Sequence, residues 1–385
     1  MNFNYVSLGN KIKTKRESLL LSSFEVAEKV GVTESSYLQI ENGTSDNVSG
    51  DLIVRISLCL NVDFRFLISP DYLTAENEVN ELFRINNSLT KSDRASIQNF
   101  IRLCEYKSEI EELLGKTKPN PGDYSTYRFP NRRHDLQGKE CAKIERQRLG
   151  IIGPIDNPYN LLRSQKIHIF RKQLEERNIS GLYIKHPRAG DCILINYLDD
   201  IYRQNFSLMH EYGHVLFDSK EKQSVSYINK NNYIETRANN FSSYFLLPED
   251  QMMIFTKNSS LDTTKAKISA VCNHYKINRH VVIYRLLKMK YITEQTKDFL
   301  LKDRDLKAKT HVKIDPELSN CSANNRDFYE LLIKQGLSIE YLELCRCAYD
   351  QGEISFSKVV EAFNCDMKTA LKILNTWNVS YGGNI

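Results

Sequence analysis

The residues best suited to chemistry are two histidines, His210 and His214, in the stretch "FSLMHEYGHVLF". Positions four apart lie on one face of a helix, so the two imidazoles can reach a single metal ion. Glu211 lies one position round the helix, where it can contact a water on that ion but is poorly placed to bind the ion itself. This arrangement suits hydrolysis, because the metal activates water and polarises a carbonyl group while the glutamate accepts the proton.

The alternative is an ordinary buried helix that carries a few polar residues. The apolar residues around the histidines predict that the helix is buried: Leu208, Met209, Val215, Leu216 and Phe217. Buried histidines and a buried glutamate are costly unless they have partners, and a metal ion would provide one. Gly213 costs about 1 kcal/mol inside a helix, which indicates a close approach by backbone or ligand at that point. We therefore favour a metal site.

A catalytic metal needs a third protein ligand and an open position for water. The best candidate is Glu235, which lies 21 residues after His214 in a second amphipathic helix, "YIETRANNFSSYFLLPED". Asn239 and Asp218 are each placed to accept a hydrogen bond from the second ring nitrogen of a histidine. Weaker candidates for the third ligand are Asp218, Glu221 and Glu249. The expected cofactor is one zinc ion, and a His/His/Glu set also accepts manganese.

The residues before the histidine helix predict a small β-structure. "GLYIK" and "CILINY" are short strand-like runs, and "HPRAGD" between them is a plausible hairpin turn. An amphipathic helix precedes these runs, and more helices follow the histidine pair. The expected context of the metal site is therefore mainly helical, with a few strands.

The stretch from about residue 145 to residue 301 resembles the ImmA/IrrE family of zinc metallo-endopeptidases. The match runs in order through "GPIDN", "ISGLYIKHP", "CILINYLDDIYRQNFSLMHEYGHVLF" and "ETRANNFSSYFLLPED". The resemblance implies a zincin-like domain of gluzincin type, with His210, His214 and Glu235 as zinc ligands and Glu211 as the base. It also implies an edge strand at residues 192–196 that pairs with a peptide substrate. Candidates for stabilising the oxyanion are Tyr244, His274 and His280.

The N-terminal segment "LSSFEVAEKVGVTESSYLQIENG" predicts two short helices joined by a tight turn. Ser22 can cap the first helix, Gly31 turns the chain, and Thr33 can cap the second. The segment resembles the helix-turn-helix of the Cro/phage-repressor (XRE) family, over roughly residues 8–68. The resemblance implies that the second helix enters the major groove of double-stranded DNA by its N-terminal residues. By position the residues that contact bases are Glu34, Ser35, Ser36 and Gln39.

The charge of this segment argues in both directions. Residues 1–70 contain seven Lys/Arg and eight Asp/Glu, a net charge of −1, whereas affinity for duplex DNA depends largely on neutralising phosphates. In favour of DNA, Lys13, Lys15 and Arg16 cluster before the motif and could contact a phosphate strand, and a homodimer would double every contact. Against it, Ser23 replaces the glutamine that often begins the first motif helix. The alternative is a helical protein-interaction module.

Composition limits the class of protein. The 385 residues carry a formal net charge of +5 and nine cysteines, with no C-x-x-C pair. Scattered cysteines in an odd number are typical of a reduced, cytoplasmic protein, not of a disulfide framework. The N-terminus shows no signal pattern, and no apolar run approaches the roughly 20 residues of a membrane span. We expect a cytoplasmic protein without a membrane partner.

The predicted fold class is α+β and mostly α. We expect a five-helix helix-turn-helix domain over residues 1–72, and a helical connector and linker over residues 73–139. The zincin-like metallopeptidase domain follows over residues 140–310, and a helical region of unknown role over residues 311–385. The linker is placed at "GKTKPNPGDYSTYRFPNRR", where Gly, Pro and Asn interrupt all periodicity.

Three functions compete. The first is a DNA-binding regulator whose zinc endopeptidase domain cuts a protein substrate; the resemblance implies that this substrate is a helix-turn-helix transcriptional repressor. The second is a transcriptional regulator or antitoxin that binds its own operator, with the metal domain as sensor or scaffold. The third is a general peptidase whose N-terminal domain only mediates oligomerisation.

Overall fold

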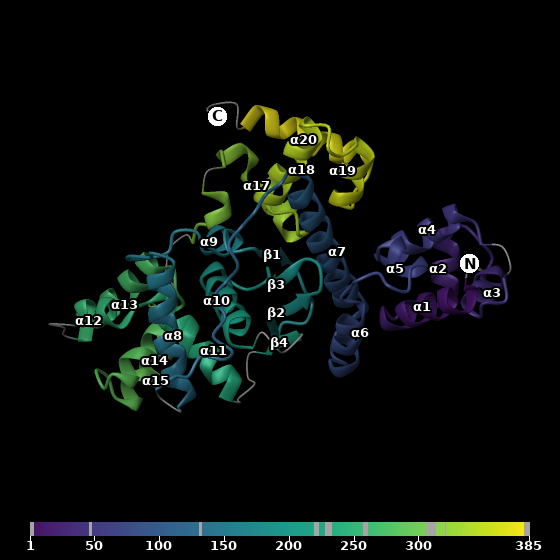
Figure 1. Cartoon of the computed structure of the whole chain (residues 1–385). Helices are drawn as coiled ribbons and strands as arrows, with labels where there is room; N and C mark the ends of the chain where they lie inside the picture. Colours follow the sequence, from purple (N-terminus) through teal and green to yellow (C-terminus); the bar gives the residue numbers. More distant parts are fainter. Residues whose placement is uncertain are drawn as a thin grey trace.

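The computed structural model describes residues 4–45, 48–130, 133–218, 223–227, 233–256, 261–304, 306, 313–319 and 321–380. Within these residues the chain is mainly helical, with one four-stranded sheet near the middle of the molecule (Figure 1). The α+β, mostly α fold predicted from the sequence is confirmed. None of the helices that the structure describes is long and apolar enough to cross a membrane.

Five N-terminal helices form the helix-turn-helix module: α1 (Tyr5–Ser18), α2 (Ser23–Val30), α3 (Glu34–Glu41), α4 (Gly50–Leu60) and α5 (Phe64–Ile68). Ser22 caps α2 in a capping box with Glu25, and Thr33 caps α3 through the backbone N–H of Ser36. Gly31 ends α2 with φ of 72°, a left-handed conformation that glycine adopts without strain. The two helices and the turn lie where the sequence predicts them.

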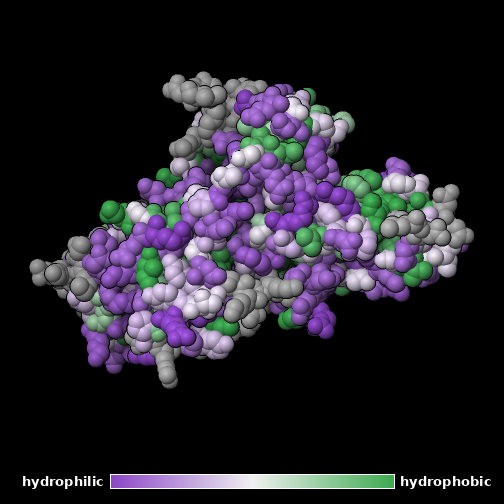
Figure 2. Space-filling model, viewed as in Figure 1, coloured by the Kyte–Doolittle hydropathy of each residue, from purple (hydrophilic) through white to green (hydrophobic). Residues whose placement is uncertain are grey.

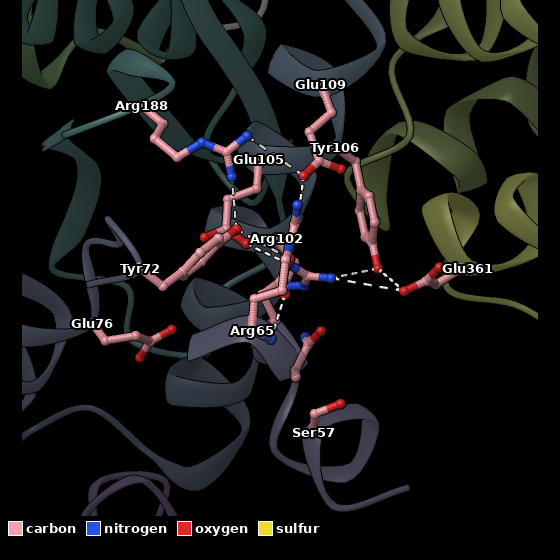
Figure 3. Close-up of polar contacts among 12 residues, drawn as sticks. Ser57, Arg65, Tyr72, Glu76, Arg102, Glu105, Tyr106, Glu109, Arg188 and Glu361 are labelled. Carbon is pink, nitrogen blue, oxygen red and sulfur yellow. Dashed lines mark hydrogen bonds and ion pairs between the residues drawn. The ribbon is translucent and has the colours of Figure 1, made fainter. Parts of the chain in front are cut away.

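Two further helices, α6 (Glu76–Ile85) and α7 (Lys91–Leu113), connect this module to the sheet. Figure 3 shows the charged network at the junction, where Arg102 of α7 pairs with Asp63 at 3.1 Å and with Glu105 of its own helix at 2.5 Å. Arg188, in the turn between two strands, donates to the hydroxyl of Tyr72 at 2.7 Å. The helix-turn-helix module is therefore joined to α7 through buried and half-buried ion pairs, and Glu109 of α7 pairs in turn with Arg188 at 3.6 Å.

The sheet has the order β1-β3-β2-β4. Its strands are β1 (Ile167–Lys172), β2 (Ile179–His186), β3 (Gly190–Asn196) and β4 (Gln223–Tyr227). The expected hairpin is present, since β2 and β3 are antiparallel and His186 faces Gly190 across the turn. The expectation that residues 192–196 form an edge strand is wrong, because β1 pairs in parallel with the other side of β3. In the described sheet, β4 is the edge strand beside β2.

Both faces of the sheet are buried. On one face Phe170 contacts Phe100 of α7 and Tyr341, with ring centroids 6.2 and 5.5 Å apart. On the other face Ile169, Ile193 and their neighbours pack in the core that holds the histidine helix. On that side α9 (Pro158–Arg163) and α10 (Ile201–Phe217) lie against the sheet. Beyond α10 lie α8 (His134–Arg148), α11 (Tyr233–Leu246), α12 (Glu249–Thr256), α13 (Leu261–Tyr275), α14 (Arg279–Lys288) and α15 (Glu294–Lys302) (Figure 1).

The irregular stretch expected to be a linker packs against α8 and α10. The backbone N–H of Tyr124 donates to the carbonyl oxygen of Leu216 at 2.7 Å, and the Tyr124 hydroxyl donates to Glu145 at 2.8 Å. Burial raises the pKa of the Tyr124 hydroxyl, and the neighbouring carboxylate of Glu145 raises it further. The absence of periodicity correctly indicated no regular structure, but this stretch is held against α8 and α10.

The C-terminal residues form the short 3-10 helix η1 (Pro316–Leu318) and the helices α17 (Ala323–Lys334), α18 (Ile339–Asp350), α19 (Phe356–Phe363) and α20 (Met367–Ser380). Their apolar residues share one core with α7 and the helix-turn-helix module. The tyrosine hydroxyl of Tyr106 in α7 also donates to Glu361 of α19 at 2.5 Å. The helical region predicted over residues 311–385 is thus part of the central packing.

A buried ion-pair cluster attaches η1 to the sheet and yields a stability prediction. Glu317 pairs with Arg163 and, at 2.6 Å, with Arg171, and all three side chains are at most 3% exposed. Glu317→Gln leaves two buried guanidinium groups with less negative charge, so we expect it to lower the free energy of unfolding by about 3–5 kcal/mol. Chemical denaturation followed by circular dichroism measures this loss. The control is Glu294→Gln, which removes an exposed pair with Lys297 and should cost about 0–1 kcal/mol.

The same cluster predicts how the stability of the folded protein changes at acid pH. Burial opposes ionisation of Glu317, but Arg163 and Arg171 outweigh it and hold the pKa of this carboxyl below its usual range. A lowered folded-state pKa stabilises the protein above the unfolded-state pKa of about 4.3, and this contribution is lost as the pH falls further. The loss of stability between about pH 5 and pH 2 should therefore be smaller in Glu317→Gln than in the parent protein. An identical acid profile in the two proteins would contradict the assignment.

Candidate metal centre

The helix α10 places the histidine pair in the interior of the molecule. Asp200 caps it by accepting hydrogen bonds from the backbone N–H groups of Tyr202 and Arg203. His210 and His214 are 5% and 1% exposed, and Glu211 is fully buried. The apolar residues that predicted a buried helix are themselves buried, so the three polar side chains lie inside a packed core.

The second helix, α11, brings Glu235 to the histidines because the two helices approach closely. A Cβ at Gly213 would lie 3.3 Å from the Cα of Ala238, which explains the glycine inside α10. The hydroxyl of Ser242 donates to the carbonyl oxygen of Phe206 at 2.8 Å and holds the helices together one turn before His210. The close approach that the sequence indicated at Gly213 is an approach of helix backbone.

His210, His214 and Glu235 converge on one point. The Nε2 atoms of the two histidines are 3.2 Å apart. The Glu235 carboxylate lies 3.1 Å from Nε2 of His210 and 3.8 Å from Nε2 of His214. One ligand atom from each of the three residues lies within 4.8 Å of the other two.

The opposite ring nitrogens are held by acceptors. Nδ1 of His210 lies 2.9 Å from Oδ1 of Asn239, and Nδ1 of His214 lies 2.9 Å from Oδ2 of Asp218. With a proton on each Nδ1, both Nε2 atoms present lone pairs to the same point. The structure thus brings Asn239 and Asp218 to the positions that the sequence suggested for them, and Asp218 contacts a histidine instead of joining the three converging groups.

The electrostatics of the cluster are those of a cation site. Burial disfavours the charged form of His214, but the hydrogen bond to Asp218 and the carboxylates of Glu211 and Glu235 outweigh it, so the pKa of this histidine is raised. The same negative charges would stabilise a divalent ion. Two imidazole nitrogens and one carboxylate oxygen form a donor set that fits zinc and that other divalent metals also accept. The residues present therefore fit a metal ion.

Sequence reasoning missed Arg237, which extends the histidine's hydrogen-bond chain. It donates to Oδ1 of Asp218, whose other oxygen contacts His214, and its guanidinium lies 4.3 Å from the ring centroid of Phe217. Arg237 comes two residues after Glu235 in "ETRANN". That spacing places it on a different side of α11 from Glu235 and gave no signal for this contact.

Glu211 lies against the sheet, beside a glycine that the sequence analysis did not single out. A Cβ at Gly181 of β2 would lie 2.9 Å from Oε1 and 3.1 Å from Cγ of Glu211, and 3.1 Å from Cδ1 of Ile195. A side chain at position 181 would therefore have to displace the glutamate. The space for Glu211 depends on glycine at this position in β2.

The contact makes Gly181→Ala a test of the site. If Glu211 is the proton acceptor, the added methyl group should move it and lower the rate of peptide hydrolysis by about 10- to 100-fold, because small misplacements of a reacting group are costly. Metal content, measured by inductively coupled plasma mass spectrometry, should not change. Gly190→Ala is the control, since a Cβ at this half-buried glycine at the start of β3 meets nothing within 4 Å; its positive φ adds some strain but no contact with the site. Equal activity in Gly181→Ala and the parent protein would contradict the assigned position of Glu211.

The remaining candidates for this site lie elsewhere. Glu249 pairs with Lys139 of α8, and Glu221 falls outside the residues that the structure describes. The guanidinium of Arg285 lies 3.7 Å from the ring centroid of Tyr244. His274 packs on the ring of Tyr275, and His280 lies 2.8 Å from Asn278. None of these contacts joins the three oxyanion candidates to His210, His214 or Glu235.

The helix-turn-helix residues divide into two groups. Glu34, Ser35, Ser36 and Gln39 are exposed along α3, and Lys13 is exposed on α1. Lys15 is 1% exposed and pairs with Glu76, so the expectation that it contacts a phosphate strand is wrong for this structure. Arg16 also forms contacts within the helix-turn-helix module.

The internal contacts of Arg16 and Ser23 modify the expected DNA surface. Arg16 pairs with Glu41 at 2.6 Å and donates to the carbonyl oxygen of Leu21 at 2.9 Å. The side-chain hydroxyl of Ser23 donates to Glu34 at 2.5 Å. Arg16 holds α3 against α1, and Ser23 fixes the first side chain of α3. The cluster of basic residues before the motif therefore presents fewer charges to DNA than its sequence suggests.

Comparison with known protein families finds two matches along the chain. Residues 12–67 match the family model described as a helix-turn-helix, and residues 162–287 match the model of the IrrE N-terminal-like domain. The first match covers most of α1–α5, and the second contains β1–β4 with His210, His214 and Glu235. No curated protein matches the chain.

Proposed function

Because the chain joins an XRE-type helix-turn-helix domain to an ImmA/IrrE-type metallopeptidase domain, we propose that it is a DNA-binding regulator with zinc-dependent endopeptidase activity. The proposed substrate is a protein, and specifically a helix-turn-helix transcriptional repressor. The observation that carries the proposal is the convergence of His210, His214 and Glu235 with Glu211 buried beside them. Four ionisable groups in one core are costly unless they serve a site.

In this proposal His210, His214 and Glu235 hold the metal ion. When bound, zinc supplies the Lewis acidity that makes water nucleophilic and polarises the scissile carbonyl group. Glu211 accepts the proton from the attacking water and passes it to the leaving amine. Asn239 and Asp218 keep the imidazoles oriented through Nδ1. An extended substrate that adds to the described sheet would have to pair with one of its edge strands, β1 or β4, since β3 is interior.

Substrate choice is tested by incubating the zinc-loaded protein with helix-turn-helix repressors encoded near it, with itself, and with an unrelated unfolded protein such as casein. Cleavage products are identified by intact mass spectrometry. We expect one or a few cuts in a repressor and none in casein. Unselective digestion of casein would favour a general peptidase. No cleavage of any protein would leave only the DNA-binding function.

The DNA-binding half of the proposal assigns base contacts to Glu34, Ser35, Ser36 and Gln39, and a phosphate contact to Lys13. Lys13→Ala should weaken binding to all duplexes and reduce the magnitude of the salt slope, d log K/d log[salt], by about 1. Gln39→Ala should weaken binding to the operator more than to random DNA. Fluorescence anisotropy with the upstream control region of the gene measures both. The control is Lys368→Ala, an exposed lysine of α20, and an equal loss in this variant would contradict the assignment.

We also propose a homodimer, because the helix-turn-helix module has little positive charge of its own. Figure 2 shows apolar surface gathered over α4 and α5, where Val54, Leu58 and Phe64 are 41%, 56% and 44% exposed. A second copy that covers this surface would double the contacts with a palindromic operator. Phe64→Glu should then shift the mass measured by light scattering from dimer to monomer, and a parent protein that is monomeric at all concentrations would exclude the dimer.

The alternative function is a transcriptional regulator or antitoxin that binds its own operator, in which the metal domain acts as a sensor or as a scaffold. It is favoured by the ion pairs that join α5 and its N-cap to α7, and α7 to the β2–β3 turn, because they connect the DNA-binding module to the sheet through α7. This alternative predicts tight, salt-sensitive operator binding that persists in Glu211→Gln and His210→Ala, together with no cleavage by the parent protein.

A further inference from the structure

A cleft of about 1110 Å³ lies between the helix-turn-helix module, α7, the end of β1 and the C-terminal helices. Its lining includes four lysines: Lys29 of α2, Lys91 of α7, Lys172 at the end of β1, and Lys334 of α17. The described lining contains one carboxylate, that of Glu175, which accepts a hydrogen bond from the hydroxyl of Thr90 at 3.0 Å. The described lining therefore carries more positive than negative charge, and it includes none of the three converging residues His210, His214 and Glu235.

Lys172 forms part of the buried floor of this cleft. It is 8% exposed, and its ammonium group donates to Oδ1 of Asn99 and to the carbonyl oxygen of Gln335, each at 2.6 Å. Both acceptors are neutral. An ammonium group has three N–H donors, so these two hydrogen bonds leave one donor for a ligand.

Two other buried lysines of this protein each form an ion pair with a carboxylate. Lys15 pairs with Glu76, and Lys107 pairs with Glu340 at 2.6 Å. Within the described part of the chain, no ion pair is found for Lys172. A buried cation without a counter-charge is costly, and burial lowers the pKa of Lys172 to about 8. An anion that enters the cleft would supply the missing charge.

The rest of the lining fits a small molecule with an anionic group and an apolar body. Lys29 is exposed at the rim, while Lys91 and Lys334 pair with exposed carboxylates of Glu25 and Glu330 that an anion could replace. The floor beside Lys172 is apolar and is formed by Leu60, Leu103, Leu337 and Phe363. Gly336 is needed there, because a Cβ at this position would lie 3.2 Å from the methylene groups of Lys172.

We propose that this cleft binds a small phosphorylated molecule, whose phosphate pairs with Lys172 and whose apolar part packs on the floor. Walls from the helix-turn-helix module, the sheet and the C-terminal helices enclose the ligand. Its binding therefore joins the DNA-binding module to the sheet that carries Gly181 and contacts Glu211. The cleft is an effector site, independent of whether the metal cluster is catalytic.

The test uses the full-length protein, with pyrophosphate and ADP as probes and citrate as the carboxylate comparison, all at constant ionic strength. Isothermal titration calorimetry measures affinity, and differential scanning fluorimetry measures the change in Tm. We expect saturable binding of pyrophosphate and tighter binding of ADP. Lys172→Met should weaken both by roughly 10- to 100-fold, the effect of losing one charge-assisted hydrogen bond. Lys185→Met, which removes an exposed lysine outside the cleft, should bind like the parent protein.

The rise in Tm caused by the ligand separates this proposal from a purely structural role of Lys172. Lys172→Met removes an unpaired buried charge but also leaves Asn99 and the carbonyl oxygen of Gln335 without their donor, so the Tm without ligand is only the baseline. The rise in Tm on adding pyrophosphate or ADP should be lost in this variant, whereas a purely structural lysine would leave the rise unchanged. A second variant, Ser96→Glu, places a carboxylate in the cleft and should abolish binding of both probes, while Ser96→Gln should retain it. The proposal is overturned if neither phosphate probe binds saturably, if citrate binds as tightly as pyrophosphate, or if Lys172→Met binds the probes like the parent protein.

Discussion

Replacing Glu211 with glutamine should reduce peptide hydrolysis by about 10²- to 10⁴-fold, because an amide cannot accept the proton that a general base removes. The substitution keeps the size of the side chain, so the packing against Gly181 and Ile195 should persist. Metal affinity should remain close to that of the parent protein, since Glu211 is not among the three converging groups. Cleavage is measured by mass spectrometry under single-turnover conditions, and the metal by calorimetric titration.

Two outcomes would contradict this role of Glu211. Full activity in Glu211→Gln would show that another group accepts the proton. Loss of the metal together with the activity would show that Glu211 is a ligand. The matched control is Glu249→Gln, because Glu249 was a weaker candidate for the site and pairs with Lys139 on the surface. It should retain both activity and metal.

The second large effect is expected from Glu235→Ala. The carboxylate lies 3.1 Å from one imidazole nitrogen of the cluster and 3.8 Å from another, so its loss removes one of the three ligands of the proposed site. Loss of a group that only orients a ligand typically costs 10- to 100-fold in metal affinity. Removal of Glu235 should therefore weaken zinc binding by more than about 100-fold and abolish hydrolysis at limiting zinc.

The structural consequence of the same change can be measured without an activity assay. Zinc that binds only the folded protein raises its stability, so the parent protein should show a Tm that increases with zinc concentration. Glu235→Ala should lose most of this increase, whereas Asn239→Ala, which removes only the acceptor for His210, should keep a reduced increase. An equal response to zinc in the parent protein and Glu235→Ala would remove Glu235 from the metal site.

The parts of the site that follow from local sequence could be predicted. The spacing of His210 and His214 places them on one face of a helix, and Glu235 begins the next amphipathic segment with small residues beside it. The caps Ser22 and Thr33, and the turn at Gly31, follow from the chemistry of helix ends. Each of these inferences depends on residues within a few positions of each other in the sequence.

The parts of the fold and the site that depend on long-range packing could not be predicted from the sequence. The run that forms β1 was not recognised as a strand, and its pairing with β3 decides which strands are edges. The sequence suggests that Lys15 contacts a phosphate of DNA, whereas in the structure it pairs with Glu76, which lies 61 residues later. The room that Gly181 leaves for Glu211 joins β2 to α10, and no periodicity within either segment reports such a contact.

The most direct test of the metal centre is an anomalous diffraction measurement at the zinc edge on crystals of the zinc-loaded protein. The account predicts one strong peak bound by Nε2 of His210, Nε2 of His214 and a carboxylate oxygen of Glu235, at about 2.0–2.2 Å, with solvent in the remaining position and Glu211 near that solvent. A peak that is absent from this point, or one that binds Glu211 while Glu235 turns away, would contradict it.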